Sequence, residues 1–313
     1  MSRAFVFPGQ GSQAVGMGKD LAAAFPIARH LFEEIDEALR QKLSRLMFEG
    51  PENELTLTEN AQPALMAVSL AIVRVLESDG KFLLADKCAF VAGHSLGEYS
   101  ALAAAQGLPV AATARLLKAR GQAMQQAVPV GQGAMAALLG LDVEAADSVA
   151  KEAAGREVCV VANDNAVGQA VVSGSKAAVE RAVALAATKG GRRSMLLPVS
   201  APFHCPLMEP AAKAMAAALA EAPIVEPLVP LVSNVTASAV RDPAEIRRLL
   251  VEQVTGRVRW RESVLYMKGA GVDTLVELGA GRVLSGLVKR IDKEITGQSV
   301  QTPAEIESLA KTL

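Results

Sequence analysis

The chain has 313 residues, of which 51% are hydrophobic and only 4% aromatic, and its formal net charge at pH 7 is −1. This composition excludes a disordered chain and indicates a core of Ala, Val and Leu, as in parallel sheets covered by helices. The near-zero net charge lacks the basic excess of proteins that bind nucleic acid or membrane surfaces, so we expect neither as a partner.

The sequence predicts a cytoplasmic protein. The apolar run at residues 4–7 is too short for the core of a signal peptide. The most apolar later stretch, residues 64–76, is broken by Ser69 and Arg74 and falls short of the roughly 20 residues that span a bilayer. The three cysteines show no CxxC spacing and there are only three histidines, so we expect reduced thiols and no metal site.

The first half of the chain predicts two strands, each followed by a turn and helices. Residues 4–7 form an apolar strand that ends at a Pro-Gly-Gln-Gly turn, and helical spacing over 28–46 then predicts one amphipathic helix carrying His30 in a structural role. After a second apolar helix over 60–77, residues 88–92 read as a strand. This strand runs into Gly93-His94-Ser95-Leu96-Gly97 and an alanine-rich helix.

The middle of the chain predicts a separate small unit. Strands are expected at 134–139, 157–162, 169–174 and 194–199, with helices at 142–154 and 176–189. This βαββαβ order is typical of a ferredoxin-like subdomain. After Pro202 a long alanine-rich helix, a strand near 231–233, a basic helical stretch and a strand at 274–278 return to the larger unit.

We therefore expect an α/β fold, namely an α/β-hydrolase-like large domain with a mostly parallel sheet and an inserted ferredoxin-like subdomain. The predicted boundaries are 1–126 and 201–313 for the two parts of the large domain and 127–200 for the insertion.

Ser95 is the candidate nucleophile. It occupies the centre of a GxSxG sequence between a predicted strand and a predicted helix, and such a sharp turn exposes the serine oxygen. The glycines relieve crowding at the turn, and the helix N-terminus presents amide donors to a developing oxyanion. The alternative for this motif is a packing turn with no chemistry.

The general base is either His94 or His204. His94 lies on the same tight turn as Ser95, where its ring cannot easily reach the hydroxyl, whereas His204 lies in a loop after a predicted strand. We therefore favour His204, with an ordinary exposed loop histidine as the alternative.

Four motifs together resemble the malonyl-CoA:acyl carrier protein transacylases of fatty acid synthesis. They are Phe-Pro-Gly-Gln-Gly-Ser-Gln at 7–13, Gly-His-Ser-Leu-Gly-Glu-Tyr at 93–99, Arg-Gly at 120–121 and Pro-Phe-His at 202–204. They stand in the family's order with similar gaps, and the resemblance spans nearly the whole chain.

The resemblance implies a role for each matching residue. It implies Ser95 as nucleophile, His204 as base and Arg120 as the ligand of the malonyl carboxylate, with the backbone amides of Gln10 and Leu96 as the oxyanion hole. Gln253 matches the position whose main-chain carbonyl orients the histidine, so no acidic third member is expected. Glu98 is expected in the first turn of the elbow helix, where an acid interacts well with the helix dipole and can cap amides, so its role is expected to be structural. Tyr99 receives no role, and none beyond the alternative base is assigned to His94.

The implied activity is a ping-pong transfer of malonyl from coenzyme A to the phosphopantetheine thiol of an acyl carrier protein, through an ester on Ser95. Malonyl-CoA is then a substrate, no cofactor is required, and we expect a monomer. The acceptor could serve fatty acid synthesis, a polyketide system or a malonate decarboxylase. The alternatives are a serine thioesterase, which has no need of Arg120, and a binding module without turnover.

Two further patterns carry weaker hypotheses. Residues 9–14 fit a GxGxxA dinucleotide fingerprint, with Glu33 and Glu34 near the place of a ribose-binding acid. Two basic clusters are solvated faces or steering patches for an acidic carrier and a phosphate-rich thioester. The first basic cluster comprises Lys189, Arg192 and Arg193, and the second comprises Arg257, Arg259 and Arg261.

Overall fold

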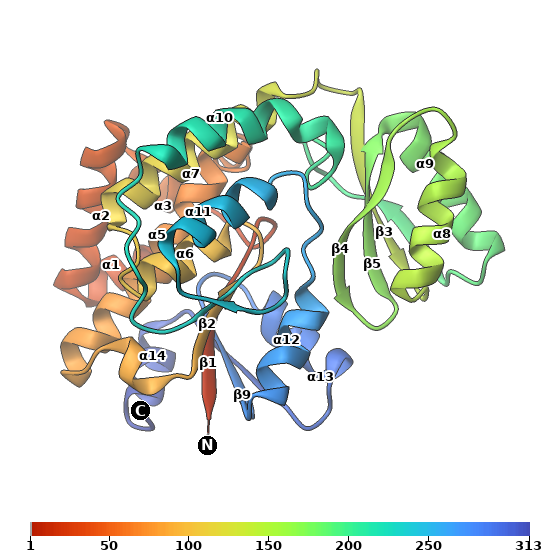
Figure 1. Cartoon of the computed structure of the whole chain (residues 1–313). Helices are drawn as coiled ribbons and strands as arrows, with labels where there is room; N and C mark the ends of the chain where they lie inside the picture. Colours follow the sequence, from red (N-terminus) through yellow and green to blue (C-terminus); the bar gives the residue numbers. More distant parts are fainter. Residues whose placement is uncertain (1) are drawn as a thin grey trace.

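The computed structural model describes residues 2–313 and contains two separate sheets (Figure 1). The larger has the strand order β10-β9-β1-β2-β7-β8, in which only the short edge strand β8 runs antiparallel. Its strands are β1 (Arg3–Phe7), β2 (Phe90–Gly93), β7 (Leu231–Val232), β8 (Ala239–Val240), β9 (Thr274–Leu278) and β10 (Thr296–Val300). The mostly parallel sheet of the predicted large domain is confirmed.

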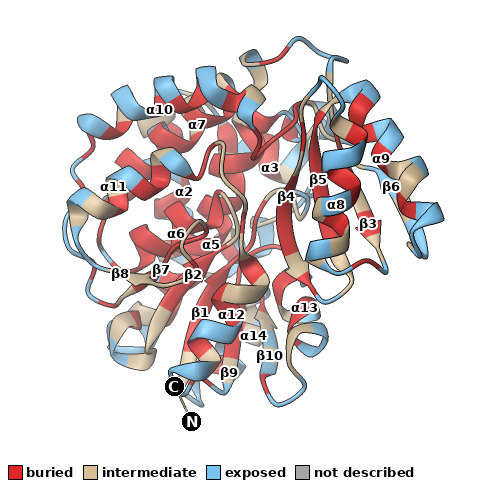
Figure 2. Cartoon of the chain, turned by 45° about the vertical axis from the view of Figure 1, so that its right-hand side comes forward, coloured by how far each residue is buried: buried red, intermediate tan, exposed pale blue. Residues whose placement is uncertain are grey.

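Helices cover both faces of the large sheet. In β1, Phe5 and Phe7 belong to the core on one face and Ala4 and Val6 to the core on the other, as the alternation of side chains along a strand requires. Figure 2 shows the strands of the large sheet buried beneath helices whose outer surfaces are exposed. The core on the first face includes residues of α5 (Thr58–Gly80) and α6 (Gly97–Ala104), which contact the sheet, and of α7 (Val110–Gln126) and α10 (Glu209–Ala220), which form a further layer. The core on the second face includes residues of α12 (Trp260–Gly269) and α13 (Val283–Ile291).

Further helices complete this large unit. They are α1 (Lys19–Ala24), α2 (Pro26–Leu39), α3 (Leu43–Glu49), α4 (Glu52–Leu55), α11 (Pro243–Glu252), α14 (Pro303–Ala310) and the short 3₁₀ helices η1 (Leu84–Lys87) and η2 (Pro206–Met208).

The second sheet is fully antiparallel, with the order β4-β5-β3-β6, and carries α8 and α9 on one face. Its elements are β3 (Gly133–Leu139), α8 (Val143–Ala154), β4 (Cys159–Ala166), β5 (Gln169–Ser175), α9 (Lys176–Thr188) and β6 (Arg193–Leu196). This order and connectivity confirm the ferredoxin-like prediction. All six elements fall inside the predicted 127–200 segment, and they form a body beside the large sheet in Figure 1.

The two units are tied together at the inner edge of the small sheet. Asn163 of β4 forms a parallel bridge with Val258, and the backbone amide of Asp164 donates to the carbonyl of Val258 at 3.0 Å. The carboxylate of Asp164, which is only 2% exposed, also pairs with Arg261 at 2.9 Å. The small sheet is therefore anchored to the loop that follows α11.

The prediction of a single helix over residues 28–46 is wrong. The apolar periodicity of 28–46 predicted a single helix, but α2 ends at Leu39, Arg40 adopts a left-handed conformation at φ 49°, and α3 begins at Leu43. The carboxylate of Asp36 accepts from the backbone amide and hydroxyl of Ser44 at 2.8 and 2.6 Å, which stabilises the bend. Both helices present apolar residues at the same spacing, so periodicity alone does not reveal the break.

Among residues 2–313, α5 alone has the length and composition of a membrane span, but 83% of its apolar window is buried inside the protein. It packs against α2, α6 and α7. Its apolar character is that of a core helix.

Candidate active site

Ser95 lies on a sharp elbow between β2 and α6. Its φ of 55° is in the left-handed region, which a serine adopts only where the surroundings enforce it. The glycines make the elbow possible: a Cβ on Gly93 would lie 1.9 Å from the carbonyl of Gly97, and a Cβ on Gly97 would lie 2.2 Å from the carbonyl oxygen of Phe7. The helix can therefore approach β1 closely only with glycine at these positions.

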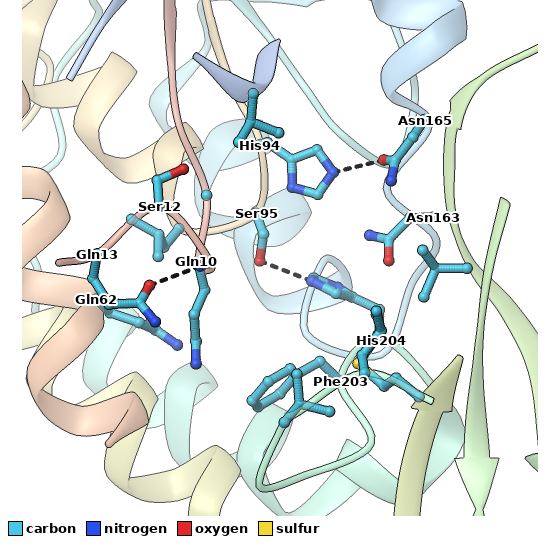
Figure 3. A pocket seen from close by; sticks show the side chains of 18 of the residues that line it. Gln10, Ser12, Gln13, Gln62, His94, Ser95, Asn163, Asn165, Phe203 and His204 are labelled. Atoms are coloured by element: carbon cyan, nitrogen blue, oxygen red, sulfur yellow. Dashed lines mark hydrogen bonds between the residues drawn. The ribbon is translucent and has the colours of Figure 1, made fainter. Parts of the chain in front are cut away.

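His204 and Ser95 meet across the pocket (Figure 3). The Ser95 Oγ and the His204 Nε2 are 2.8 Å apart, although the residues are separated by 109 positions in the chain. His204 itself has a φ of 57° in the loop between β6 and η2. Two strained backbone positions thus face each other, as is common at functional sites.

The second ring nitrogen of His204 fixes its tautomer. Its Nδ1 lies 2.8 Å from the main-chain carbonyl oxygen of Gln253, and a carbonyl can only accept, so Nδ1 carries the hydrogen. Nε2 is then free to accept the proton of Ser95. Burial, and next the positive charge of Arg120, lower the pKa of His204 to about 3, so the imidazole is neutral at pH 7.

His94 faces away from this pair. Its Nε2 lies 2.9 Å from the Oδ1 of Asn165, on β4 of the small sheet (Figure 3). Burial lowers its pKa, so it too is neutral. The ring links the elbow to the small sheet, and it is His204 rather than His94 whose ring nitrogen lies within hydrogen-bond distance of Ser95 Oγ.

Arg120 lies on α7 and reaches the same hydroxyl. Only 1% exposed, it donates from Nη2 to Ser95 Oγ at 3.1 Å and to Gln253 Oε1 at 2.8 Å, and from Nη1 to Gln62 Oε1 at 2.9 Å. The ring of Tyr99 stands 5.7 Å from its guanidinium carbon, a cation–π distance.

No carboxylate among residues 2–313 forms an ion pair with Arg120, and its Nε–H has no hydrogen-bond partner there. Its hydrogen-bond partners among residues 2–313 are all neutral, and burial lowers its pKa although the charge of Glu98 acts in the opposite direction without direct contact. A buried cation hydrogen-bonded only to neutral groups is costly, and it is ready to bind an anion.

Two backbone amides line the pocket together with Ser95. Gln10, in the turn after β1, and Leu96, directly after Ser95, both line the pocket. Within the described chain, neither amide donates to another protein group. Both are thus available to an oxygen developing charge beside Ser95, as an oxyanion hole requires.

The pocket has a volume of about 650 Å³ and lies between the two units. Its walls come from the β1 turn and α7 on one side and from β3, β4 and β5 of the small sheet on the other. Apolar side chains from both units, Met124, Met135, Val171 and Phe203, line it beside the polar cluster. A cavity of this size and mixed character is typical of a small-molecule site.

Comparison with known proteins places this geometry in a family. The model of the acyl transferase domain matches residues 4–304. The malonyl CoA-acyl carrier protein transacylases of Bacillus subtilis and Escherichia coli are each 45% identical, over 99% and 96% of this chain and 96% of each relative.

Solved structures agree. An acyl-carrier-protein-S-malonyltransferase from Bartonella henselae superposes with a TM-score of 0.97 at 54% identity, covering 100% of this chain and 99% of that one. A malonyl-transacylase in complex with a type II PKS acyl-carrier protein gives a TM-score of 0.96 at 42% identity, with full coverage of both chains. The chain belongs to the malonyl-CoA:acyl carrier protein transacylase family. It is an acyltransferase.

The dinucleotide alternative does not suit this transacylase. The fingerprint requires a helix N-terminus within the glycine motif to face a pyrophosphate. Here the first helix, α1, begins only at Lys19, and Gln10 and Gly11 line the pocket beside Ser95 instead. Glu33 and Glu34 are exposed on α2.

The second basic cluster is engaged in ion pairs that hold the transacylase together. Arg257 pairs with Asp147, Arg259 with Glu262, and Arg261 with Asp164. This cluster therefore acts mainly at the junction of the two units. In the first cluster Lys189 pairs with Glu152, and the exposed Arg192 and Arg193 stay candidates for steering.

Sequence reasoning missed two residues and gave a third, Glu98, only a helix-capping role. Asn234 accepts from the backbone amide of Ser95 at 2.7 Å and donates to the carbonyl of Gly93 at 2.6 Å, so its side chain braces the elbow. Gln62 binds Arg120 from α5. The one signal for Asn234 was its place after a parallel strand, at the edge where functional residues gather.

Proposed function

We propose that this transacylase moves a malonyl group from malonyl-CoA to the phosphopantetheine thiol of an acyl carrier protein by a ping-pong mechanism, through an ester on Ser95. The observation that carries the proposal is Arg120, a buried cation that forms no ion pair with a carboxylate of residues 2–313 and whose Nη2 lies 3.1 Å from the Ser95 oxygen. An acyl group held at Ser95 with a free carboxylate one or two bonds away would supply that partner.

The first half-reaction forms the ester. Ser95 Oγ attacks the thioester carbonyl while His204 Nε2 takes its proton, and the amides of Gln10 and Leu96 receive the oxyanion. The carbon–sulfur bond then breaks, and the coenzyme A thiolate takes the proton from the imidazolium. The carbonyl of Gln253 keeps the ring aimed throughout and helps to stabilise its charged form.

Binding of the substrate carboxylate also prepares the base. The charge of Arg120 is the second cause of the low pKa of His204, after burial. A carboxylate paired with Arg120 offsets that charge, so the basicity of His204 rises when a malonyl group occupies the site. Uncharged acyl groups do not provide this effect.

The second half-reaction reverses the first with a new thiol. The carrier's phosphopantetheine thiol gives its proton to His204 and attacks the ester, and Ser95 Oγ leaves with that proton. Thioesters and oxygen esters differ modestly in energy, so the cycle needs neither metal nor ATP. Its main requirement is exclusion of water, which the apolar side chains from both units favour.

We propose a monomer working in the cytoplasm, where coenzyme A thioesters and carrier proteins are available. We propose that the acceptor carrier protein serves fatty acid synthesis. Comparing the rates of malonyl transfer to this carrier and to carriers of a polyketide system and of a malonate decarboxylase tests the assignment.

Intact-mass measurement tests the proposal. Mixing the protein with malonyl-CoA should add one malonyl unit, and adding a holo carrier protein should remove that unit from the enzyme and place it on the carrier. Release of free malonate without transfer would identify a thioesterase instead, and binding without a mass increase would indicate a module without turnover.

A further inference from the structure

A buried glutamate lies directly behind the nucleophile. Glu98 is 1% exposed, in the first turn of α6, three residues after Ser95. Its Oε2 accepts from the side-chain Nε2 of Gln253 at 2.7 Å and from the backbone amide of Asn234 at 3.1 Å. Glu98 does not line the pocket, so any effect on the reaction must pass through its partners.

The side-chain amide of Gln253 has only one orientation that suits its neighbours. Its Nε2 donates to Glu98 Oε2 and, at 2.9 Å, to the carbonyl of Ser95, while its Oε1 accepts from Arg120 Nη2 at 2.8 Å. A flipped amide would place oxygen against two acceptors and nitrogen against a donor. Of the two acceptors, only Glu98 belongs to a side chain.

The orientation of the Gln253 amide determines which of its atoms faces Arg120. Gln253 Oε1 and Gln62 Oε1 accept from the two terminal nitrogens of Arg120, and these two hydrogen bonds fix the plane of its guanidinium. A guanidinium without one of these acceptors can rotate, and bidentate binding of a carboxylate depends on a fixed plane.

We propose that Glu98 is a positioning residue for substrate selection: its carboxylate holds the Gln253 amide so that an acceptor faces Arg120, and thereby orients Arg120 for the malonyl carboxylate. This inference rests on the proposed function, since it assigns Arg120 to that carboxylate. The main-chain carbonyl of Gln253 holds His204 independently of the side chain, so Glu98 influences substrate binding more than the proton transfer.

The arrangement tolerates a change in the protonation of Glu98. Burial raises the pKa of this carboxyl to about 7, against the opposing effect of hydrogen bonds from Gln253 and Asn234. Both donors meet the same oxygen, Oε2, so a proton can reside on Oε1 while the acceptor remains. The ability of Glu98 to hold the Gln253 amide therefore depends on its acceptor oxygen Oε2 rather than on its negative charge.

Two substitutions separate acceptor from charge. Glu98→Gln keeps a carbonyl oxygen for Gln253 and Asn234 but removes the charge, whereas Glu98→Leu removes the acceptor. We expect Glu98→Leu to raise the KM for malonyl-CoA and to lower the malonyl-to-acetyl preference at least tenfold, with kcat changed less than threefold. Glu98→Gln should restore the preference to within about threefold of the wild type.

Asp36 provides the matched control. It is also a buried carboxylate, 8% exposed, that accepts from a backbone amide and a side chain, but it lies at the α2–α3 bend. Asp36→Leu should lower the melting temperature without altering the malonyl-to-acetyl preference. A purely structural Glu98 would behave in the same way.

A double variant and a second site complete the test. In an Arg120→Ala background, Glu98→Leu should change the preference no further, because the group it orients is gone. Gln253→Met removes the side-chain hydrogen bonds of Gln253 to Glu98, Ser95 and Arg120 but keeps the main-chain carbonyl for His204, and should reproduce the loss of preference even if Glu98→Leu does not fold.

Three results would overturn the assignment: a folded Glu98→Leu with wild-type preference, equal losses in Glu98→Gln and Glu98→Leu, or an unchanged preference in Gln253→Met. Failure of the wild-type protein to accept a malonyl unit from malonyl-CoA would instead refute the proposed function itself.

Discussion

The main-chain carbonyl of Gln253 accepts a hydrogen bond from Nδ1 of His204 at 2.8 Å, so a neutral peptide group stands behind the imidazole. A carboxylate at this position would raise the pKa of the ring, whereas a carbonyl provides orientation with a weaker electrostatic effect. Burial and the positive charge of Arg120 lower the pKa of His204 and outweigh the raising effect of this hydrogen bond, so His204 is held in the neutral form that can accept a proton from Ser95.

Ser95→Ala should abolish covalent labelling by malonyl-CoA, because no other hydroxyl lies within reach of His204 Nε2 in the hydrogen bonds of residues 2–313. The fold should survive, since alanine fits the space of a serine. Intact mass and circular dichroism measure the two effects. Ser148→Ala, on the exposed face of α8, should label normally; a label retained by Ser95→Ala would remove Ser95 as the nucleophile.

His204→Ala should slow acylation by roughly 10²–10⁴-fold, the range typical of a lost general base. His94→Ala should cost less, because His94 Nε2 faces Asn165 rather than Ser95. Single-turnover acylation rates for both variants decide the matter. An equal or larger loss for His94→Ala would assign the base to His94.

Arg120→Ala should reduce malonyl transfer by roughly 10²-fold or more, since losing one partner of a buried charged pair costs about 2–5 kcal/mol. Acetyl transfer should rise relative to malonyl transfer, because acetyl no longer leaves a buried cation unpaired. The ratio of kcat/KM for the two thioesters measures this. Arg115→Ala, on the same helix but exposed, should keep the wild-type ratio; an unchanged ratio in Arg120→Ala would exclude Arg120 as the carboxylate ligand.

Gly97→Ala should disturb the elbow, because the added Cβ would lie 2.2 Å from the carbonyl oxygen of Phe7 and 2.9 Å from that of Pro8. Backbone must shift to relieve this contact, at a cost of roughly 1–3 kcal/mol or more. We expect a lower melting temperature and slower acylation. Gly269→Ala is the control: a Cβ at this position has no neighbour within 4 Å, and Gly269 is the last residue of α12. The melting temperature of this variant should equal or exceed that of the wild type.

The acid limb of the pH profile for acylation should lie well below the ordinary histidine pKa. With the pKa of folded His204 lowered to about 3, the base stays deprotonated as pH falls from 6.5 to 5. Over that window the unfolded chain binds a proton at this residue that the folded chain does not, so the contribution of His204 to stability decreases as pH falls. The pH dependence of kcat/KM for acylation, which reports groups of the free enzyme, tests the first statement from pH 7 to 4.5, and an acid limb near 6.5 would contradict it.

Stability against pH, compared between the wild type and His204→Ala, tests the second statement. The stability of the wild type relative to the variant should decrease between pH 6.5 and 5. A difference that stays constant across this window would show that His204 titrates alike in the folded and unfolded states.

Local patterns predicted most of the fold. The small sheet was predictable because each of its strands and helices has its own apolar periodicity, and the βαββαβ order allows few arrangements. The elements after residue 281, namely α13, β10 and α14, were not predicted. For the edge strand β10 the reason is that its sequence Thr-Gly-Gln-Ser-Val carries almost no apolar alternation. The break between α2 and α3 was missed because both helices present the same apolar face.

By itself, the sequence determined the elbow around Ser95, since its glycines and the strand-to-helix change are properties of neighbouring residues. It also named His204, Arg120, Gln10, Leu96 and Gln253 through motif resemblance. Tertiary structure alone decided that Arg120 is buried without an ion-pair partner in the described part of the chain, and that Glu98 meets the Gln253 amide across 155 positions. The physical reason is that periodicity encodes backbone conformation and the buried face of each element, whereas partners of a buried polar group depend on how distant elements pack.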